Sequence, residues 1–347
     1  MTPRAPPLPD LLCPTAMWLE RHWQRITALG IALYPLSLLF RAVVAARRAA
    51  YTHGVLRTGH LPVPVIVVGN VTVGGTGKTP LVLWLAAFLQ QRGMQPAIVS
   101  RGYGAPETTP RPVAPTSAPA RFGDEPVLLA QRSGCPVWVG RDRVAAAHAL
   151  LAAHPSTDVI ISDDGLQHYR LARDIEIAVV DGTRGLGNGL MLPAGPLREP
   201  ASRLATVDAV VVNGGGAVAD AWPGALTMRL EGREFRNVLN PGWVVGPEHF
   251  QRKRVRAIAG IGHPPRFFSH LDALGLQFEA IAFEDHHAYT ARDIALADAE
   301  AIVMTEKDAV KCAAFASEVH WALPVAAVPD PELGELVLHK LKIKSPP

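Results

Sequence analysis

Short apolar runs alternate with helical stretches through the middle of the chain. The runs between residues 64 and 214 are rich in β-branched residues and apolar on both faces. They are Val65–Val68, Ala97–Ser100, Val137–Val139, Val159–Ser162, Ile175–Val180 and Ala209–Val212. This alternation is typical of a parallel sheet covered by crossover helices on both faces. Because ligands of such sheets bind at the carboxyl ends of the strands, we expect the functional site at that edge.

The pattern changes towards the C-terminus. Around 225–242 the alternation fades into a turn-prone Asn240-Pro241-Gly242, and a second set of strands is then predicted at Arg256–Ala259, Glu279–Phe283, Ala301–Met304 and Ala322–Ala326. We also interpret Pro106–Pro119 as a flexible surface loop. The predicted segments are an N-terminal amphipathic, membrane-associated segment at 1–50, a parallel-sheet domain at 51–224, an inter-domain linker at 225–250 and a smaller α/β domain at 251–347.

The most apolar segment is Ile26–Phe40, flanked by Arg25 and Arg41. A bilayer crossing needs about 20 apolar residues, and this segment has 15 and contains a proline. We therefore expect a helix that lies in the membrane interface, with Trp18, Trp23 and Tyr34 at the level of the headgroups. Two alternatives stay open, namely a helix packed on the protein's own core and a single span extended through 42–46.

Composition narrows the class of protein. The chain has 347 residues, 48% of them hydrophobic, which is enough for two domains. Its net charge is +3, and six arginines against two acids place +4 within residues 1–50, so we expect no nucleic-acid partner. The three cysteines are too few and too scattered for a disulfide framework or a zinc site, which favours a reducing, cytoplasmic location for the catalytic part.

A phosphate-binding loop follows the first predicted strand. The loop comprises Thr72, Val73, Gly74, Gly75, Thr76, Gly77, Lys78 and Thr79. Glycines allow backbone N–H groups to surround phosphate oxygens, the lysine reaches the β- and γ-phosphates, and the hydroxyl of Thr79 holds Mg²⁺. Thr72 stands where the P-loop pattern has its first glycine, so the match is incomplete. The loop predicts a nucleoside triphosphate and Mg²⁺ as the ligands of a P-loop NTPase-like domain.

Acidic residues supply the second element of a nucleotide site. The strand at Val159–Ser162 ends in Asp163 and Asp164, the position of the Walker B carboxylates that reach Mg²⁺. Phosphoryl transfer to an alcohol also needs a group that accepts the hydroxyl proton. Asp124 is one candidate, although it could instead cap the helix that begins there. The Asp285-His286-His287 cluster after a strand is another.

These motifs in this order resemble the tetraacyldisaccharide 4'-kinase family, the lipid A kinases of Gram-negative bacteria. The resemblance extends from about residue 15 to 340. It is carried by Gly69-Asn70, Gly74-Gly75-Thr76-Gly77-Lys78-Thr79-Pro80, Ser100-Arg101-Gly102-Tyr103-Gly104, Gly123-Asp124-Glu125, Asp163-Asp164-Gly165-Leu166-Gln167-His168, Leu192-Pro193-Ala194-Gly195-Pro196-Leu197-Arg198-Glu199, Gly260-Ile261-Gly262, Asp285-His286-His287 and Thr305-Glu306-Lys307-Asp308.

The resemblance implies transfer of the ATP γ-phosphoryl group to the 4'-hydroxyl of an acylated disaccharide 1-phosphate at the cytoplasmic face of the inner membrane. It implies that Lys78, Asp124 and His286 are catalytic, with His286 preferred to His287, and that closure of the second domain completes the site. By the same resemblance Thr79, Glu125, Asp163 and Asp164 hold Mg²⁺. Residues implied near the lipid substrate are Arg101, Tyr103, Gln167, His168 and Arg198.

Some readings stay open at the level of the sequence. Arg141 and Arg143 could bind a phosphate or begin a solvated helix. A regulatory or assembly NTPase at the membrane is the main alternative function, and a binding module with a degenerate nucleotide site is another. Thr305-Glu306-Lys307-Asp308 does not have the spacing of a guanine-specific motif, and its role stays unassigned. The oligomeric state is also left open.

Overall fold

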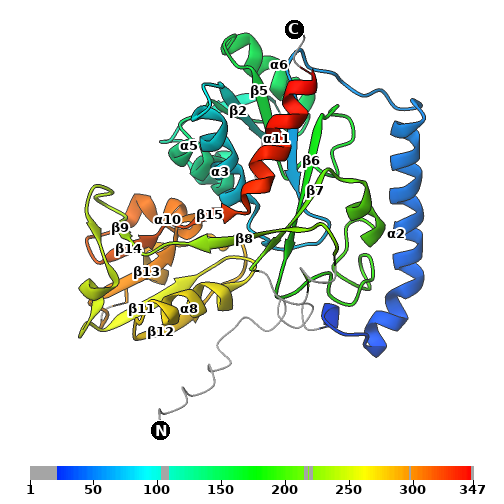
Figure 1. The fold of residues 1–347 in the computed structure, drawn as a ribbon. Coiled ribbons are helices and arrows are strands. Elements are labelled where there is room, and N and C mark those ends of the chain that lie inside the picture. The colour runs from blue at the N-terminus through cyan, green and yellow to red at the C-terminus, as the bar shows by residue number, and fades with distance from the viewer. Residues whose placement is uncertain (1–21, 103–108, 215–217, 219–221, 297, 345–347) are drawn as a thin grey trace. The chain divides into compact units, whose positions relative to one another are not determined.

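The structure is a computed structural model that describes residues 22–102, 109–214, 218, 222–296 and 298–344 (Figure 1). The chain divides into two compact units. The smaller unit contains Gly232–Pro324, and the larger one contains the described parts of Glu20–Glu231 and Val325–Pro347. Each unit has its own sheet.

The larger unit contains a nine-stranded sheet in the order β15-β8-β7-β6-β1-β5-β2-β4-β3. Its neighbours pair in parallel except at the two edges, where β15 and β3 are antiparallel to β8 and β4. The strands are β1 (Val65–Gly69), β2 (Pro96–Ser100), β3 (Arg111–Val113), β4 (Val137–Val139), β5 (Val159–Asp163), β6 (Ile175–Asp181), β7 (Ala209–Asn213), β8 (Leu226–Glu231) and β15 (Ala326–Pro329). The predicted parallel α/β class is confirmed.

Helices follow most of these strands. Those of the larger unit are α2 (Ala28–Thr52), α3 (Lys78–Gln90), α4 (Pro119–Phe122), α5 (Asp124–Arg132), α6 (Arg143–Ala153), η1 (Ala201–Thr206) and α11 (Pro331–Lys344). The central strands β1 and β5 are buried at every position, because helices cover both faces of the sheet. Their carboxyl ends are Gly69 and Asp163, and the register pairs Val68 with Asp163. This pairing brings the phosphate loop and the acidic pair to adjacent positions at one edge.

The smaller unit contains a six-stranded sheet in the order β10-β9-β14-β13-β11-β12. Its strands are β9 (Phe235–Asn237), β10 (Val244–Val245), β11 (Val255–Ala259), β12 (Phe278–Ala282), β13 (Ala301–Thr305) and β14 (His320–Leu323). Its helices are η2 (Pro247–Phe250), α8 (Pro264–Ala273), α9 (Ala291–Ile294), α10 (Glu306–Cys312) and η3 (Ala313–Phe315). The strands β12, β11, β13 and β14 are parallel, so their carboxyl ends also share one edge.

The boundaries between the two units differ from the domain boundaries that the sequence pattern predicts. The proposed linker 225–250 is not a connection: β8 extends the large sheet, and β9 and β10 belong to the small one. The predicted strand at Ala322–Ala326 is two strands, β14 and β15, which lie in different sheets. The chain returns to the larger unit because β15 pairs with β8, and α11 then packs beside α3 at Gly334 and Phe88. Part of the predicted proline-rich loop is also ordered, as β3 and α4.

The N-terminal helix is longer than the apolar segment indicated. α2 has 25 residues (Figure 1, blue). It is not interrupted by Pro35, and it continues past Arg41 to Thr52. One face contacts its own unit, where Ser37 Oγ donates to the carbonyl of Met191 at 2.8 Å. The opposite face is apolar and exposed, including Ile31, Leu39 and Val43. By length and composition α2 is sufficient to cross a membrane.

Candidate active site

The phosphate loop connects β1 to α3 and adopts a backbone that only glycine tolerates easily at two positions. Gly74 and Gly77 have φ of 89° and 93°, in the left-handed region. A Cβ at Gly77 would also lie 2.4 Å from Nδ2 of Asn213, which donates to the carbonyl of Thr76 at 3.0 Å. The end of β7 therefore holds the turn that starts α3, and the space there excludes any larger residue.

Thr72 explains the departure from the P-loop pattern. It does not have a positive φ, so the position does not require glycine. It is buried and forms an antiparallel bridge with Leu197, and its carbonyl accepts a hydrogen bond from Nε of Arg198 at 2.9 Å. The loop is thus supported from outside by the segment that contains Leu197 and Arg198.

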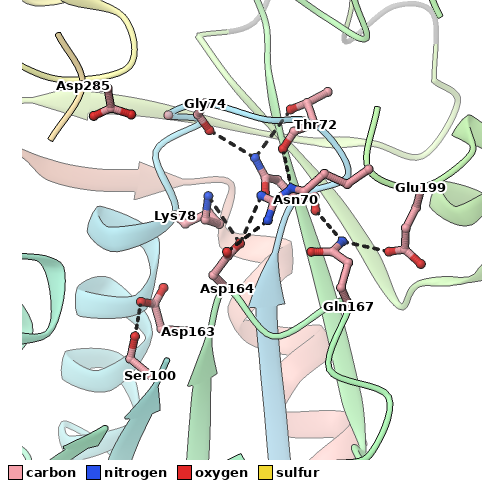
Figure 2. Close-up of polar contacts among 12 residues, drawn as sticks. Asn70, Thr72, Gly74, Lys78, Ser100, Asp163, Asp164, Gln167, Glu199 and Asp285 are labelled. Atoms are coloured by element: carbon pink, nitrogen blue, oxygen red, sulfur yellow. Dashed lines mark hydrogen bonds and ion pairs between the residues drawn. The ribbon is translucent and has the colours of Figure 1, made fainter. Parts of the chain in front are cut away.

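Asn70 is the centre of the polar network beneath the loop (Figure 2). Its amide nitrogen donates to the carbonyl of Gly74 at 3.3 Å, and its Oδ1 accepts a hydrogen bond from Arg198. Nε2 of Gln167 donates to the carbonyl of Asn70 at 2.9 Å and to Glu199 at 2.8 Å. A fully buried amide with these partners fixes the path of the loop.

Asp164 is bound between two cations. Lys78 Nζ lies 3.6 Å from its Oδ1, and Arg198 donates to both of its oxygens at 3.2 and 3.3 Å. Burial alone would raise the pKa of this carboxyl, but the charges of Lys78 and Arg198 outweigh burial and hold its pKa well below the usual range. Asp164 is therefore ionised, and its positive φ of 47° directs the side chain towards the loop.

Asp163 has the opposite electrostatic environment. It is 1% exposed, and its Oδ2 accepts a hydrogen bond from Ser100 at 3.1 Å. Its Oδ1 is buried and has no hydrogen-bond partner among the described residues. Burial, followed by the nearby negative charges of Glu125 and Asp164, raises its pKa to about 7. A buried carboxylate oxygen of this kind is ready to accept a cation.

The acidic side chains fit a magnesium site completed by phosphates. Mg²⁺ in kinases binds one or two carboxylates and the phosphate oxygens of the substrate, so few protein ligands are needed. Asp163 supplies an unused buried oxygen, and Glu125 is close enough to raise its pKa. In the part of the chain that the structure describes, no three His, Cys, Asp or Glu side chains form a metal cluster by themselves. The residues present therefore fit a cation that binds together with a nucleotide.

Asp124 begins α5 and is not its N-cap. Gly123 occupies the N-cap position, with φ of 91°, and Asp124 follows as the first helical residue. Its Oδ1 accepts a hydrogen bond from the backbone N–H of Glu125 at 3.0 Å, and the residue is 7% exposed. This hydrogen bond and the burial fit both a catalytic and a structural carboxylate, so the catalytic assignment stays a prediction.

Arg143 is buried, which excludes the solvated-helix interpretation. Its guanidinium donates to the carbonyls of Asp163 and Asp164 at 3.1 and 2.8 Å. Burial lowers its pKa to about 10, although both carboxylates oppose that shift. Arg143 thus fixes the backbone of the acidic pair.

His168 is one of the predicted substrate residues. Burial, and then the charge of Arg143, lowers the pKa of its imidazole to about 4, so the ring is neutral at pH 7.

The predicted substrate residues have different environments. Arg101 is exposed, and Tyr103 lies outside the described residues. Gln167 and Arg198 are bound within the loop network, and their contact with substrate stays a prediction. The sequence analysis assigned no role to four residues that support the phosphate loop: Asn70, Glu199 and Asn213, described above, and Arg184, which donates to the carbonyl of Gly75. Asn70 and Glu199 stood within the motifs quoted for the family, which was the available signal.

The smaller unit contributes a second cluster at the carboxyl end of its sheet. Asp285 and His286 follow β12, and Lys307 is the second residue of α10. Lys307 Nζ lies 3.5 Å from Asp285 Oδ1 and 3.4 Å from His286 Nε2. His287 is instead stacked on Phe283, with ring centroids 4.6 Å apart. The preference for His286 over His287 stays a prediction, and this packing agrees with it.

The parallel sheet, the phosphate loop and the acidic pair beside it define a P-loop nucleotide-dependent enzyme. A family model described as tetraacyldisaccharide-1-P 4'-kinase matches residues 29–342. The chain therefore belongs to the tetraacyldisaccharide 1-phosphate 4'-kinase family, as its motifs suggested.

Individual relatives agree with this family. The chain is 50% identical over 324 residues to a tetraacyldisaccharide 4'-kinase of Methylobacillus flagellatus, covering 93% of this chain and 96% of the relative. It is 51% identical over 328 residues to that of Alkalilimnicola ehrlichii, covering 92% and 94%. A crystal structure of LpxK from Aquifex aeolicus in complex with ATP matches with a TM-score of 0.77 and 29% identity, over 90% of this chain and 99% of that one.

Proposed function

We propose that this chain transfers the γ-phosphoryl group of ATP to the 4'-hydroxyl of tetraacyldisaccharide 1-phosphate, forming lipid IVA in lipid A biosynthesis. The observation that carries the proposal is the phosphate loop beside the Asp163–Asp164 pair, with Lys78 at the start of α3. Relatives about half identical over more than nine tenths of the chain carry this activity in their names. The alternative, a switch NTPase, is not favoured by these relatives.

Different residues of the larger unit bind the phosphates of ATP and the Mg²⁺ ion. Backbone N–H groups of the loop and the ammonium of Lys78 bind the β- and γ-phosphates. Thr79, Asp163, Asp164 and Glu125 are the residues that would hold Mg²⁺, which supplies positive charge to the phosphates when bound. Arg198 keeps Asp164 ionised and the loop in place.

The acceptor hydroxyl needs a base. We assign Asp124 to accept its proton because the adjacent Glu125 is close enough to Asp163 to raise the pKa of that carboxyl. We assign His286 to assist because it follows β12 at the carboxyl edge of its parallel sheet, where ligands of such sheets bind. Arg101, Tyr103, Gln167 and His168 are assigned to the disaccharide and its phosphate. An arginine suits a phosphate because its planar fork donates to two oxygens.

The larger unit meets the membrane through α2. Its exposed apolar face, with Ile31, Leu39 and Val43, matches an acceptor whose acyl chains stay in the bilayer. We place the protein at the cytoplasmic face of the inner membrane, since ATP is cytoplasmic. Leu39→Glu with Val43→Glu should reduce sedimentation with anionic phospholipid vesicles severalfold. Leu239→Glu with Val244→Glu, at exposed sites of the smaller unit, is the control, and unchanged sedimentation of the α2 variant would contradict the anchor.

The reaction itself is tested with γ-phosphate-labelled ATP, Mg²⁺ and tetraacyldisaccharide 1-phosphate in detergent micelles. Label should enter the lipid with the wild type, and Lys78→Ala should lower the rate at least about a hundredfold. Lys342→Ala, at an exposed lysine of α11, should leave the rate unchanged. Release of label as free phosphate with or without lipid would instead identify a switch NTPase.

A further inference from the structure

Lys307 lies beside both polar residues of the Asp285–His286 pair, although it comes from a different element. Its Nζ is 3.5 Å from Asp285 Oδ1 and 3.4 Å from His286 Nε2. Asp285 Oδ2 itself is 3.8 Å from His286 Nε2, too far for a hydrogen bond. Between these two side chains, the ammonium group of Lys307 makes the shorter contact with each.

We propose that Lys307 is a positioning residue that fixes the tautomer and orientation of His286. A lysine ammonium has three donors and no acceptor, so its contact with His286 is a hydrogen bond only when Nε2 carries the lone pair. The ring proton is then on Nδ1, and His286 presents an N–H donor from that nitrogen. Asp285 neutralises the ammonium that enforces this state. The proposal rests on the catalytic assignment of His286 made above.

The backbone around Lys307 is held by Asp308. This residue is fully buried, and its Oδ2 accepts hydrogen bonds from Thr305 Oγ1 at 2.7 Å and from the N–H of Gly260 at 3.1 Å. Its Oδ1 lies 2.8 Å from Lys311 Nζ. The start of α10 is thus tied to the end of β11, and the Thr305–Asp308 motif acquires a function: Asp308 anchors the turn that places Lys307.

The backbone conformation of His286 also restricts the position of its side chain. Its φ of 61° lies in the left-handed region, which is uncommon for a residue with a side chain. Such conformations persist where the surroundings impose them, and they gather at functional sites. His287, by contrast, packs edge-on to Tyr289 at 4.8 Å and stacks on Phe283. The turn therefore directs one histidine to Lys307 and the other into an aromatic cluster.

Kinetics of the full-length protein test the proposal first. Lys307→Met keeps the length of the side chain without its charge, and we expect kcat to fall about ten- to a hundredfold with KM for ATP within twofold. Lys307→Arg, which retains donors, should recover part of the loss. Lys253→Met is the matched control: its Nζ lies 2.7 Å from His249 Nε2 in another lysine–histidine contact of this unit, and kcat should not change.

A double-mutant cycle separates positioning from a direct action of Lys307. If Lys307 acts through His286, Lys307→Met should cause no further loss in the His286→Ala background. Full multiplication of the two losses would overturn the proposal, and so would a kcat of Lys307→Met within twofold of wild type. A His286→Ala variant that keeps full activity would contradict the catalytic assignment of His286, not the geometry of Lys307.

The tautomer provides a readout independent of activity. Ring-nitrogen chemical shifts of the full-length wild type, with the His286 signal identified by its loss in His286→Ala, should show the neutral ring protonated on Nδ1. Lys307→Met should shift the ring towards the Nε2-protonated form, and Lys307→Arg should resemble the wild type. A wild-type ring protonated on Nε2 would overturn the proposal, and this measurement stands even if Lys307→Met does not fold.

Discussion

At the carboxyl end of the larger sheet, charged side chains from several elements are linked into one network, whereas at the corresponding end of the smaller sheet a few polar groups surround one histidine. In the first, Lys78, Asp164 and Arg198 share charge across the phosphate loop. In the second, Lys307 lies between Asp285 and His286 and contacts both. Both edges result from parallel strands, so the sheet topology accounts for their location but not for their difference.

The difference follows from what each edge must do. A nucleotide with several negative charges requires a loop whose shape and charge exist before binding, because reorganisation would cost binding energy. The preformed charge is visible at the acidic pair, whose two carboxyls are neighbours in sequence but have pKa values shifted in opposite directions. Burial and neighbouring acids raise the pKa of Asp163, whereas two cations lower the pKa of Asp164. For the role proposed for His286, the smaller edge needs only one orientation of one imidazole ring, and the Lys307 contact is sufficient to impose it.

The largest expected effect is at Asp124. Asp124→Asn keeps the shape and the acceptor for the Glu125 N–H but removes the base, so kcat should fall about a thousandfold with ATP binding nearly unchanged. The label-transfer assay and nucleotide titration measure the two quantities. Asp272→Asn, at an exposed position of α8, is the control. If kcat stays within a few-fold of wild type, Asp124 only stabilises the start of α5.

The next effect is at Asp163. Asp163→Asn removes the buried carboxylate oxygen that we assign to Mg²⁺, so kcat should fall about a hundredfold and the Mg²⁺ concentration for half-maximal activity should rise. Titration of activity against Mg²⁺ measures both. An unchanged Mg²⁺ requirement would remove Asp163 from the metal site.

Asp163 also gives a prediction on stability. Its pKa in the folded state, about 7, is above the unfolded value, so its contribution to stability is present below the unfolded pKa and is lost as pH rises through about 7. Without Mg²⁺ and nucleotide, Asp163→Asn should therefore unfold at a higher temperature than wild type at about pH 8, with a smaller difference at about pH 5. Thermal unfolding at the two pH values measures this, and equal differences would contradict it.

A smaller effect is expected at Arg198. Arg198→Lys keeps the charge but loses the planar fork that contacts Asp164, Asn70 and Thr72 together. Activity should fall about tenfold, mainly through a higher KM for ATP. Arg229→Lys, at an exposed pair with Glu231, is the matched control. A variant with wild-type KM would show that charge alone holds the loop.

The smallest effect is expected at His287. His287→Phe retains an aromatic ring against Phe283 and Tyr289, so kcat should stay within about twofold of wild type. The same substitution at His286 should lower kcat much more. If the two variants lose activity equally, the distinction between a catalytic and a packed histidine fails.

The sequence by itself determined the elements that depend on neighbouring residues. The strand that ends at Gly69, the glycine loop, Lys78 at the helix start and the acidic pair at the end of β5 are all local patterns, and the family could be named from them. Alternation of short apolar runs likewise indicated the parallel sheet, because burial on both faces leaves a continuous apolar signal.

Tertiary structure decided what depends on residues far apart in the chain. Arg143 seemed a candidate for a solvated helix until its guanidinium was placed beneath Asp163 and Asp164. β15 returns to the larger sheet because β8 offers a free edge, which no pattern in the strand itself reveals. Lys307 meets Asp285 only because β13 lies next to β11, and β11 next to β12. Such contacts follow from strand order, which is set by the packing of the whole chain rather than by local sequence.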